Sequence, residues 1–123
     1  MEQLAGRAAV VTGAGSGIGR GIAAALAAAG THVMIADIDA AAARETAAQL
    51  AGADVEVVPV ECDVTDREAV EALASNAWAH FGHVDIAVNN AGVFPPIRRV
   101  INIDERTLAG FSRSTRAGRA ATA

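Results

Sequence analysis

The sequence predicts an α/β fold in which a parallel sheet lies between two layers of helices. Short apolar, β-branched runs alternate along the chain with longer helical stretches. Strands separated by helices of about 10 to 15 residues pair in parallel through right-handed crossovers. The expected strand order is 3-2-1-4, the first half of a doubly wound, Rossmann-type three-layer sheet that is truncated after about four strands.

Each element can be placed by its residue pattern. Strands are expected at residues 8–12, 32–36, 55–60 and 84–88, and helices at residues 18–29, 40–50 and 65–81. Gly30 and Gly82 are expected to end the first and third helices, and Asp39 and Thr65 to cap the second and third. The apolar helix faces are expected to comprise Ile22, Ala25, Leu26 and Ala29, and then Val70, Leu73, Ala77 and Trp78.

Composition and charge exclude several classes of function. The net charge is −4, and an acidic body argues against a nucleic-acid partner. No apolar run approaches the ~20 residues that span a membrane, and the N-terminus lacks the features of a signal peptide, so a cytoplasmic protein without membrane contact is expected. Cys62 is the only cysteine and is expected to be a small core residue. The histidines show no metal-ligand spacing with it, so no metal site is expected.

The turn after the first strand has the composition of a phosphate-binding turn. Residues 12–19 read Thr-Gly-Ala-Gly-Ser-Gly-Ile-Gly between a strand and a helix. Gly13 would allow the sharp turn, Gly17 the approach of a pyrophosphate, and Gly19 close packing of helix on strand. The helix N-terminus offers free N–H groups and a positive dipole end to phosphate. The expected dinucleotide-binding residues here are Gly13, Gly15, Ser16, Gly17, Ile18 and Gly19.

Asp37, at the end of the second strand, points to the choice of cofactor. A carboxylate there can accept hydrogen bonds from both hydroxyls of an adenosine ribose, each contributing about 1.5–3 kcal/mol. It would also repel a 2′-phosphate, and Ile38 supplies no cation to offset that repulsion. The sequence therefore favours NAD over NADP, and Asp37 and Ile38 are expected to be cofactor-binding residues.

Three motifs together resemble the short-chain dehydrogenase/reductase family over about residues 5–108. They are the Thr-Gly-x-x-x-Gly-x-Gly turn, Asp63-Val64 after the third strand, and Asn89-Asn90-Ala91-Gly92 at the end of the fourth. The resemblance implies that Asp63 binds the adenine amino group and that Val64 lines the adenine pocket. It also implies that the backbone of Asn90 and Gly92 passes close to the adenosine and the nicotinamide-side ribose, with Ala91 between them as a further cofactor-binding residue. Asp63 could instead be a charge at the start of the third helix. For Asn89, the sequence leaves open whether it belongs to the cofactor site or ties two strands together.

The same resemblance implies hydride transfer between NAD and an alcohol or ketone, with a Tyr, a Lys four residues later, a Ser and an Asn in the reaction. This chain contains no Tyr, and all ten of its basic residues are Arg. Two interpretations remain open. One is a truncated NAD-dependent oxidoreductase acting on CH–OH groups. The other is a non-enzymatic NAD-binding module, or a product that folds poorly. In both, this chain is expected to be inactive, and a small-molecule substrate is expected only for a complete enzyme.

The last residues differ in character from the rest. Residues 1–108 are expected to form the N-terminal part of an NAD(P)-binding domain, and residues 109–123 an aberrant, Arg-rich, disordered tail. Codons for residues 111–115, read one base earlier, can encode Val-Leu-Ala-Val-Asn, which predicts a frameshift near Gly110; the alternative is a natural short paralogue. A sheet that ends at the fourth strand would expose Val84, Ile86 and Val88 along an unpaired edge and favour self-association.

Overall fold

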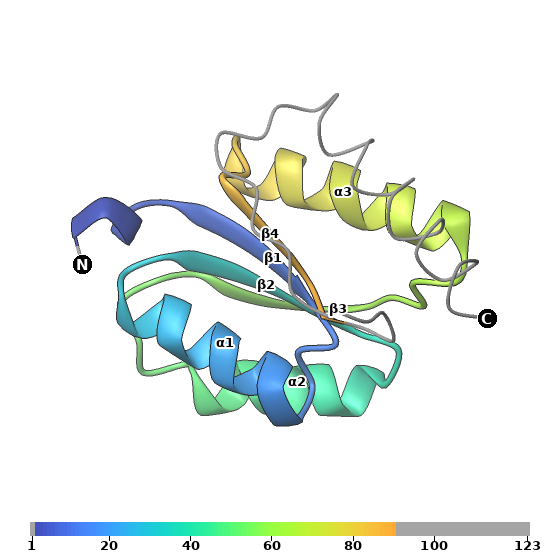
Figure 1. The fold of residues 1–123 in the computed structure, drawn as a ribbon, viewed down its shortest axis with the longest axis horizontal. Coiled ribbons are helices and arrows are strands. Elements are labelled where there is room, and N and C mark those ends of the chain that lie inside the picture. Colours follow the sequence, from blue (N-terminus) through green and yellow to red (C-terminus); the bar gives the residue numbers. More distant parts are fainter. Residues whose placement is uncertain (1, 91–123) are drawn as a thin grey trace.

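The computed structural model describes residues 2–90 and contains four strands and three α-helices within them (Figure 1). In chain order the elements are the 3-10 helix η1 (Glu2–Leu4), β1 (Ala8–Thr12), α1 (Gly17–Ala28), β2 (His32–Asp37), α2 (Ala40–Gln49), β3 (Val57–Glu61), α3 (Arg67–Phe81) and β4 (Ile86–Asn89). The predictions for Ala91, Gly92, the frame near Gly110 and the tail at residues 109–123 lie outside the described residues.

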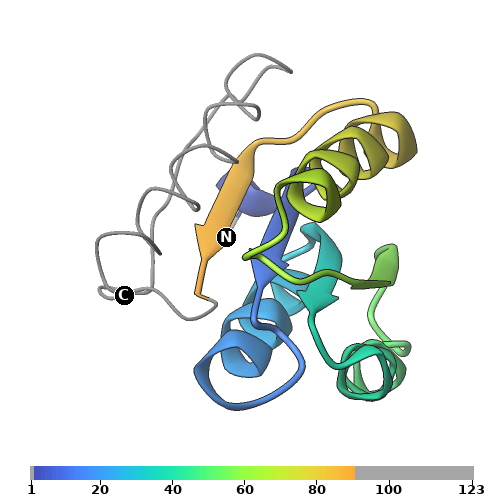
Figure 2. The same cartoon turned by 90° about the vertical axis from the view of Figure 1, so that its right-hand side faces the viewer.

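The four strands form one parallel sheet in the order β3-β2-β1-β4, as predicted. At its centre, Val10 of β1 lies beside Met34 of β2 on one side and Ala87 of β4 on the other. Helices α1 and α2 cover one face of the sheet and α3 covers the other (Figures 1 and 2). The three layers of the prediction are therefore confirmed for this part of the chain.

Alternation along the strands supplies a core on each face. Val10 and Met34 belong to the cluster under α3, and Val11 and Ile35 belong to the cluster under α1 and α2. All five residues of β1 are buried. A central parallel strand is covered on both faces, which is why its sequence is a continuous apolar run without polar alternation.

Helix α1 packs through smaller residues than the sequence pattern predicted. Gly19, Ala23 and Ala27 are its buried residues, Ile22 and Leu26 are half-buried, and Ala25 is exposed. The prediction that Ala25 belongs to the core face is therefore wrong. A stripe of glycine and alanine lets the helix approach the sheet closely, so the larger side chains lie beside the line of contact. By contrast, the predicted face of α3 is confirmed, and Trp78 packs half-buried against its edge.

The start of α3 corrects the predicted cap. Asp66, not Thr65, is the N-cap residue, and its carboxylate accepts hydrogen bonds from the backbone N–H groups of Glu68 and Ala69. Thr65 instead directs its hydroxyl to Asp63 Oδ1 at 2.7 Å. The other predicted helix signals are confirmed: Asp39 caps α2, and Gly30 and Gly82 adopt positive φ at the ends of α1 and α3.

Both later strands begin two residues after their predicted starts. Strand β3 pairs with β2 from Val57 onward, where Val57 lies beside Val33. Before β4, Asp85 contacts Ala8 through both its backbone and its side chain: its N–H donates to the Ala8 carbonyl at 2.8 Å, and its carboxylate accepts the Ala8 N–H at 2.9 Å. A hydrophobicity pattern cannot detect this contact, because it depends on a residue distant in the sequence.

The prediction that the β4 edge exposes apolar side chains is wrong for the side chains themselves. Val84, Ile86 and Val88 are each at most 5% exposed. Their side chains project toward the two faces of the sheet and belong to the two core clusters. Within residues 2–90, β4 pairs only with β1, so any free edge of this part is made of backbone.

None of the helices described is long and apolar enough to cross a membrane.

Candidate functional site

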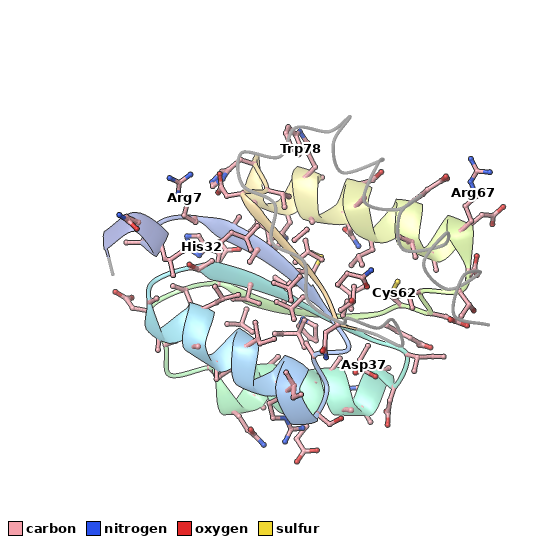
Figure 3. All side chains as sticks on the ribbon, in the orientation of Figure 1. Arg7, His32, Asp37, Cys62, Arg67 and Trp78 are labelled. Carbon is pink, nitrogen blue, oxygen red and sulfur yellow. The ribbon has the colours of Figure 1, made fainter. Side chains whose placement is uncertain are left out.

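The predicted site residues gather at the carboxyl ends of the strands. The glycine-rich turn follows β1, Asp37 ends β2, Asp63 and Val64 follow β3, and Asn90 follows β4. Figure 3 shows Asp37 and Cys62 at this end of the sheet, and Arg7 and His32 at the opposite end. The strand order reverses at β1, because β2 and β3 lie on one side of it and β4 lies on the other. Open α/β sheets bind ligands at such a switch point.

The glycines of the turn have distinct structural roles. Gly13 and Gly17 have φ values of 64° and 57°, in the left-handed region that favours glycine. A Cβ atom at Gly19 would collide with the carbonyl oxygen of Gly13, so the prediction of close packing there is confirmed. A Cβ at Gly17 would meet no protein atom within 4 Å. The space beside Gly17 is therefore open, as a site for an approaching ligand requires.

Helix α1 begins at this turn without a side-chain cap. Ser16 is its N-cap residue, but the Ser16 side chain accepts no hydrogen bond from the helix. Asp39 and Asp66 cap the other two α-helices of the described chain. No acidic residue lies in the first turn of α1 either. Its orphan N–H groups and positive dipole end remain available to an anion such as a phosphate.

Asp37 lies directly beside the turn. Its Oδ2 accepts the Gly15 N–H at 2.9 Å, and its Oδ1 accepts the Asp39 N–H at 3.0 Å. Each carboxylate oxygen can accept a second hydrogen bond, so capacity remains for two ribose hydroxyls. A Cβ at Gly15 would lie 2.8 Å from Asp37 Oδ2, which explains why glycine stands there.

Two apolar side chains frame this end of the sheet. Ile18 is 66% exposed and Ile38 is 64% exposed, and they are the large hydrophobic residues exposed within the described part of the chain. Ile18 belongs to the first turn of α1, and Ile38 directly follows Asp37. Both were predicted to be site residues. Exposed apolar side chains beside polar anchors are typical of a surface that a ligand covers.

The end of β4 fixes the turn from the other side. Asn89 is buried, and its Oδ1 lies 3.3 Å from the Thr12 hydroxyl, so it ties β4 to β1. The sequence left this role open, and the geometry decides for the tie between strands. Asn90 donates its backbone N–H to the Thr12 hydroxyl and its Nδ2 to the Gly13 carbonyl. Asn90 therefore contacts the glycine turn, and its predicted contact with the cofactor stays a prediction.

The segment after β3 contacts the end of β2. The Cys62 N–H donates to the Asp37 carbonyl at 2.8 Å. Asp63 Oδ1 accepts both the N–H and the hydroxyl of Thr65, which fits the alternative of a carboxylate near the helix start. Val64 is 8% exposed and belongs to the core under α3. The adenine contacts of Asp63 and Val64 stay predictions.

Cys62 is a buried thiol next to this segment. Burial raises its pKa to about 11, and the nearby carboxylates of Asp63 and Asp66 add to the rise. The thiol is therefore protonated at neutral pH, as expected of a core residue and not of a nucleophile. Within residues 2–90, no three His, Cys, Asp or Glu side chains gather as metal ligands do.

Two residues that the sequence did not single out also hold the turn. Arg20 donates a guanidinium N–H to the Gly15 carbonyl at 2.6 Å and its Nε–H to the Thr46 hydroxyl at 2.8 Å. Thr46 is fully buried on α2. The sequence contained a signal for Arg20: a cation near the start of a helix is unfavourable beside the helix dipole, which indicates that it has a specific partner.

These features define a Rossmann-type dinucleotide-binding unit: a parallel sheet, a glycine turn, an uncapped helix and an acidic residue at the end of β2. The family model described as short chain dehydrogenase matches residues 7–114. The chain therefore belongs to the short-chain dehydrogenase family.

Relatives and solved structures agree with this assignment. The chain is 47% identical over 91 residues to 1-deoxy-11-beta-hydroxypentalenate dehydrogenase of Streptomyces exfoliatus. The aligned residues cover 74% of this chain and 33% of that protein. A short-chain dehydrogenase/reductase of Burkholderia phymatum in complex with NAD superposes with a TM-score of 0.71 at 43% identity, over 76% of this chain and 33% of that one. A 7α-hydroxysteroid dehydrogenase complexed with NADH and 7-oxo glycochenodeoxycholic acid gives a TM-score of 0.70 at 42% identity, over 72% of this chain and 35% of that one.

The chain spans about a third of the length of these proteins. The matched part contains the sheet and the glycine turn, which supply a dinucleotide site in this fold.

Proposed function

We propose that this chain forms the NAD-binding part of a short-chain dehydrogenase that transfers hydride between NAD and an alcohol or ketone. The observation that carries the proposal is the juxtaposition of the uncapped N-terminus of α1 with the Asp37 carboxylate across the glycine turn. The first would hold the pyrophosphate through backbone N–H groups, and the second would hold the adenosine ribose.

The preference for NAD over NADP rests on the charge around Asp37. The carboxylate would accept the ribose hydroxyls and repel a 2′-phosphate. The neighbouring side chain, Ile38, is apolar and exposed. Arg20, the cation bonded to the turn, contacts the Gly15 carbonyl and Thr46 and lies 3.9 Å from Glu45, which offsets its charge. These contacts support NAD as the cofactor. Asp63, Val64, Asn90, Ala91 and Gly92 stay proposed cofactor contacts.

Calorimetric titration of the full chain with NAD tests the proposal, with a pair of glycine variants to locate the site. Gly17→Ala adds a methyl group that would meet only the ligand, at a residue with positive φ, and should weaken NAD binding by at least about tenfold. Gly21→Ala adds the same group in open space on the same helix and should leave binding unchanged. The proposal fails if the unmodified chain, shown to be folded by a cooperative melt, does not bind NAD.

We further propose that residues 1–123 alone do not catalyse the reaction. The family reaction, as the resemblance implies it, uses a Tyr acid/base beside a Lys, and this chain contains neither. A tyrosine could act near neutral pH only if a nearby cation lowered its pKa from about 10. Purified chain should therefore bind NAD without reducing it in the presence of secondary alcohols. NADH formation that rises with protein concentration and persists after repurification would contradict this.

A further inference from the structure

We propose that Arg20 is a positioning residue for the cofactor, holding the glycine turn in the place where Asp37 can meet the adenosine ribose. The inference rests on the proposed function, because it concerns the same site. It starts from the backbone of Gly15, which is held at both of its polar groups. The N–H donates to Asp37 Oδ2 at 2.9 Å, and the carbonyl accepts from Arg20 at 2.6 Å.

Arg20 can hold the turn because its other contact is rigid. Its Nε–H donates to the hydroxyl of Thr46, a fully buried residue of α2. The planar guanidinium therefore joins three elements: α1, which carries it, α2, which anchors it, and the turn. A guanidinium presents several donors in a fixed arrangement, whereas a lysine ammonium would offer a single point of charge.

Gly15 transmits this placement to Asp37. The carboxylate takes one backbone N–H from the turn through Oδ2 and one from Asp39 through Oδ1. With Arg20 removed, the Gly15 carbonyl loses its partner, and the turn loses its anchor on α2. The Oδ2 oxygen then loses its fixed donor as well. The Arg20 contact thus supports the ribose-binding orientation of Asp37 at Oδ2, while the Asp39 N–H holds Oδ1.

This role predicts a result opposite in sign to that of a simple charge effect. If Arg20 only attracted phosphate, its removal would weaken NADP more than NAD, because NADP carries the additional phosphate. If Arg20 positions Asp37, its removal weakens the recognition of the ribose hydroxyls and also relaxes the exclusion of the 2′-phosphate. The ratio of NADP to NAD dissociation constants then falls.

The test is titration of the full chain and its variants with NAD, NADP and AMP. Arg20→Gln should raise Kd for NAD and for AMP by about tenfold, corresponding to about 1.4 kcal/mol, and should lower the NADP-to-NAD ratio. Thr46→Val removes the anchor but keeps the charge, and should shift the affinities in the same direction. Arg7→Gln is the control, because Arg7 bridges to Asp85 at the opposite end of the sheet and is similarly exposed.

The amide resonance of Gly15 gives a second readout without ligand. It should shift in Arg20→Gln and in Thr46→Val and stay in place in Arg7→Gln. Unchanged NAD affinity in Arg20→Gln, or an NADP-to-NAD ratio that rises, would overturn the positioning role while leaving the proposed function intact. Absence of NAD binding by the unmodified, folded chain would overturn both.

Discussion

At the scale of single residues, the site depends on side chains whose partners are backbone groups. Asp37 accepts two N–H groups, Asn90 donates to the Gly13 carbonyl, and Arg20 donates to the Gly15 carbonyl. These contacts fix the turn without using its exposed surface. The exposed side chains of Ile18 and Ile38 lie on the two segments that these contacts join, the start of α1 and the end of β2.

Replacement of Asp37 should change the choice of cofactor. Asp37→Ala removes the acceptor for the ribose hydroxyls and the charge that repels a 2′-phosphate, so NAD affinity should fall by about tenfold to a hundredfold and the gap to NADP should narrow. Asp39→Ala is the matched control, since it removes a neighbouring carboxylate that caps α2. Calorimetry with NAD and NADP measures the difference in affinity between the two cofactors for each variant. Equal affinity for NAD and NADP in the unmodified chain would count against the ribose role of Asp37.

The Cys62 thiol should make stability depend on pH in the alkaline range. Its pKa is raised from 9.0 to about 11 in the folded chain, so the unfolded chain loses the thiol proton first. The stabilisation from the neutral thiol is fully present below pH 9 and is lost as the pH rises toward 11. Urea melts from pH 8 upward should show a steeper loss of stability for the unmodified chain than for Cys62→Ala. An identical dependence of stability on pH in the two proteins would refute the raised pKa of Cys62.

At the scale of elements, local signals and long-range contacts determine different features. Gly30, Gly82 and Asp39 act within their own helices, and their predicted roles are confirmed. The bounds of β3 and β4 depend on β2 and β1, which lie far away in the sequence. The same distinction explains α1, whose buried stripe is set by its distance from the sheet and not by its hydrophobic pattern alone.

The start of α3 offers a direct test of the corrected cap. Asp66→Ala should lower the free energy of unfolding by about 1 kcal/mol, because two N–H groups of the first turn lose their acceptor. Thr65→Ala removes an exposed hydroxyl that donates to Asp63 and caps no N–H group of the helix. It should therefore lower the free energy of unfolding by less. Chemical denaturation of both variants ranks them. A larger loss for Thr65→Ala would restore the cap that the sequence pattern indicated.

At the scale of the whole molecule, we propose that the chain self-associates through β4. The two outer strands of the described sheet differ. Strand β3 contains Pro59, which lacks a backbone donor, and ends in an exposed Glu61, both of which discourage edge pairing. Strand β4 contains neither proline nor charge. Backbone pairing between two copies is therefore expected at β4.

Sizing chromatography at micromolar concentration should show a species larger than the monomer, in equilibrium with monomer on dilution. Hydrogen exchange should locate the contact, with amides of β4 gaining protection as the concentration rises while those of β3 do not change. A single monomer peak at every concentration, together with a cooperative melt, would contradict self-association.

The sequence by itself determined the strand order, the layers and the positions of the glycine turn and of Asp37. Residues 12–19 identify the glycine-rich turn because glycine has a conformational freedom that other residues lack, and Asp37 follows from its place at the end of a strand. These are local features, and local physics leaves them readable in one chain.

Only the tertiary structure decided which groups meet. It showed that Asn89 ties β4 to β1, that the Asp85 carboxylate accepts the N–H of Ala8, and that Arg20 and Thr46 hold the turn. The bonds of Asn89, of Asp85 and between Arg20 and Thr46 join residues separated by at least 26 positions. Such bonds need a particular distance and direction, and these exist only once the helices have packed on the sheet.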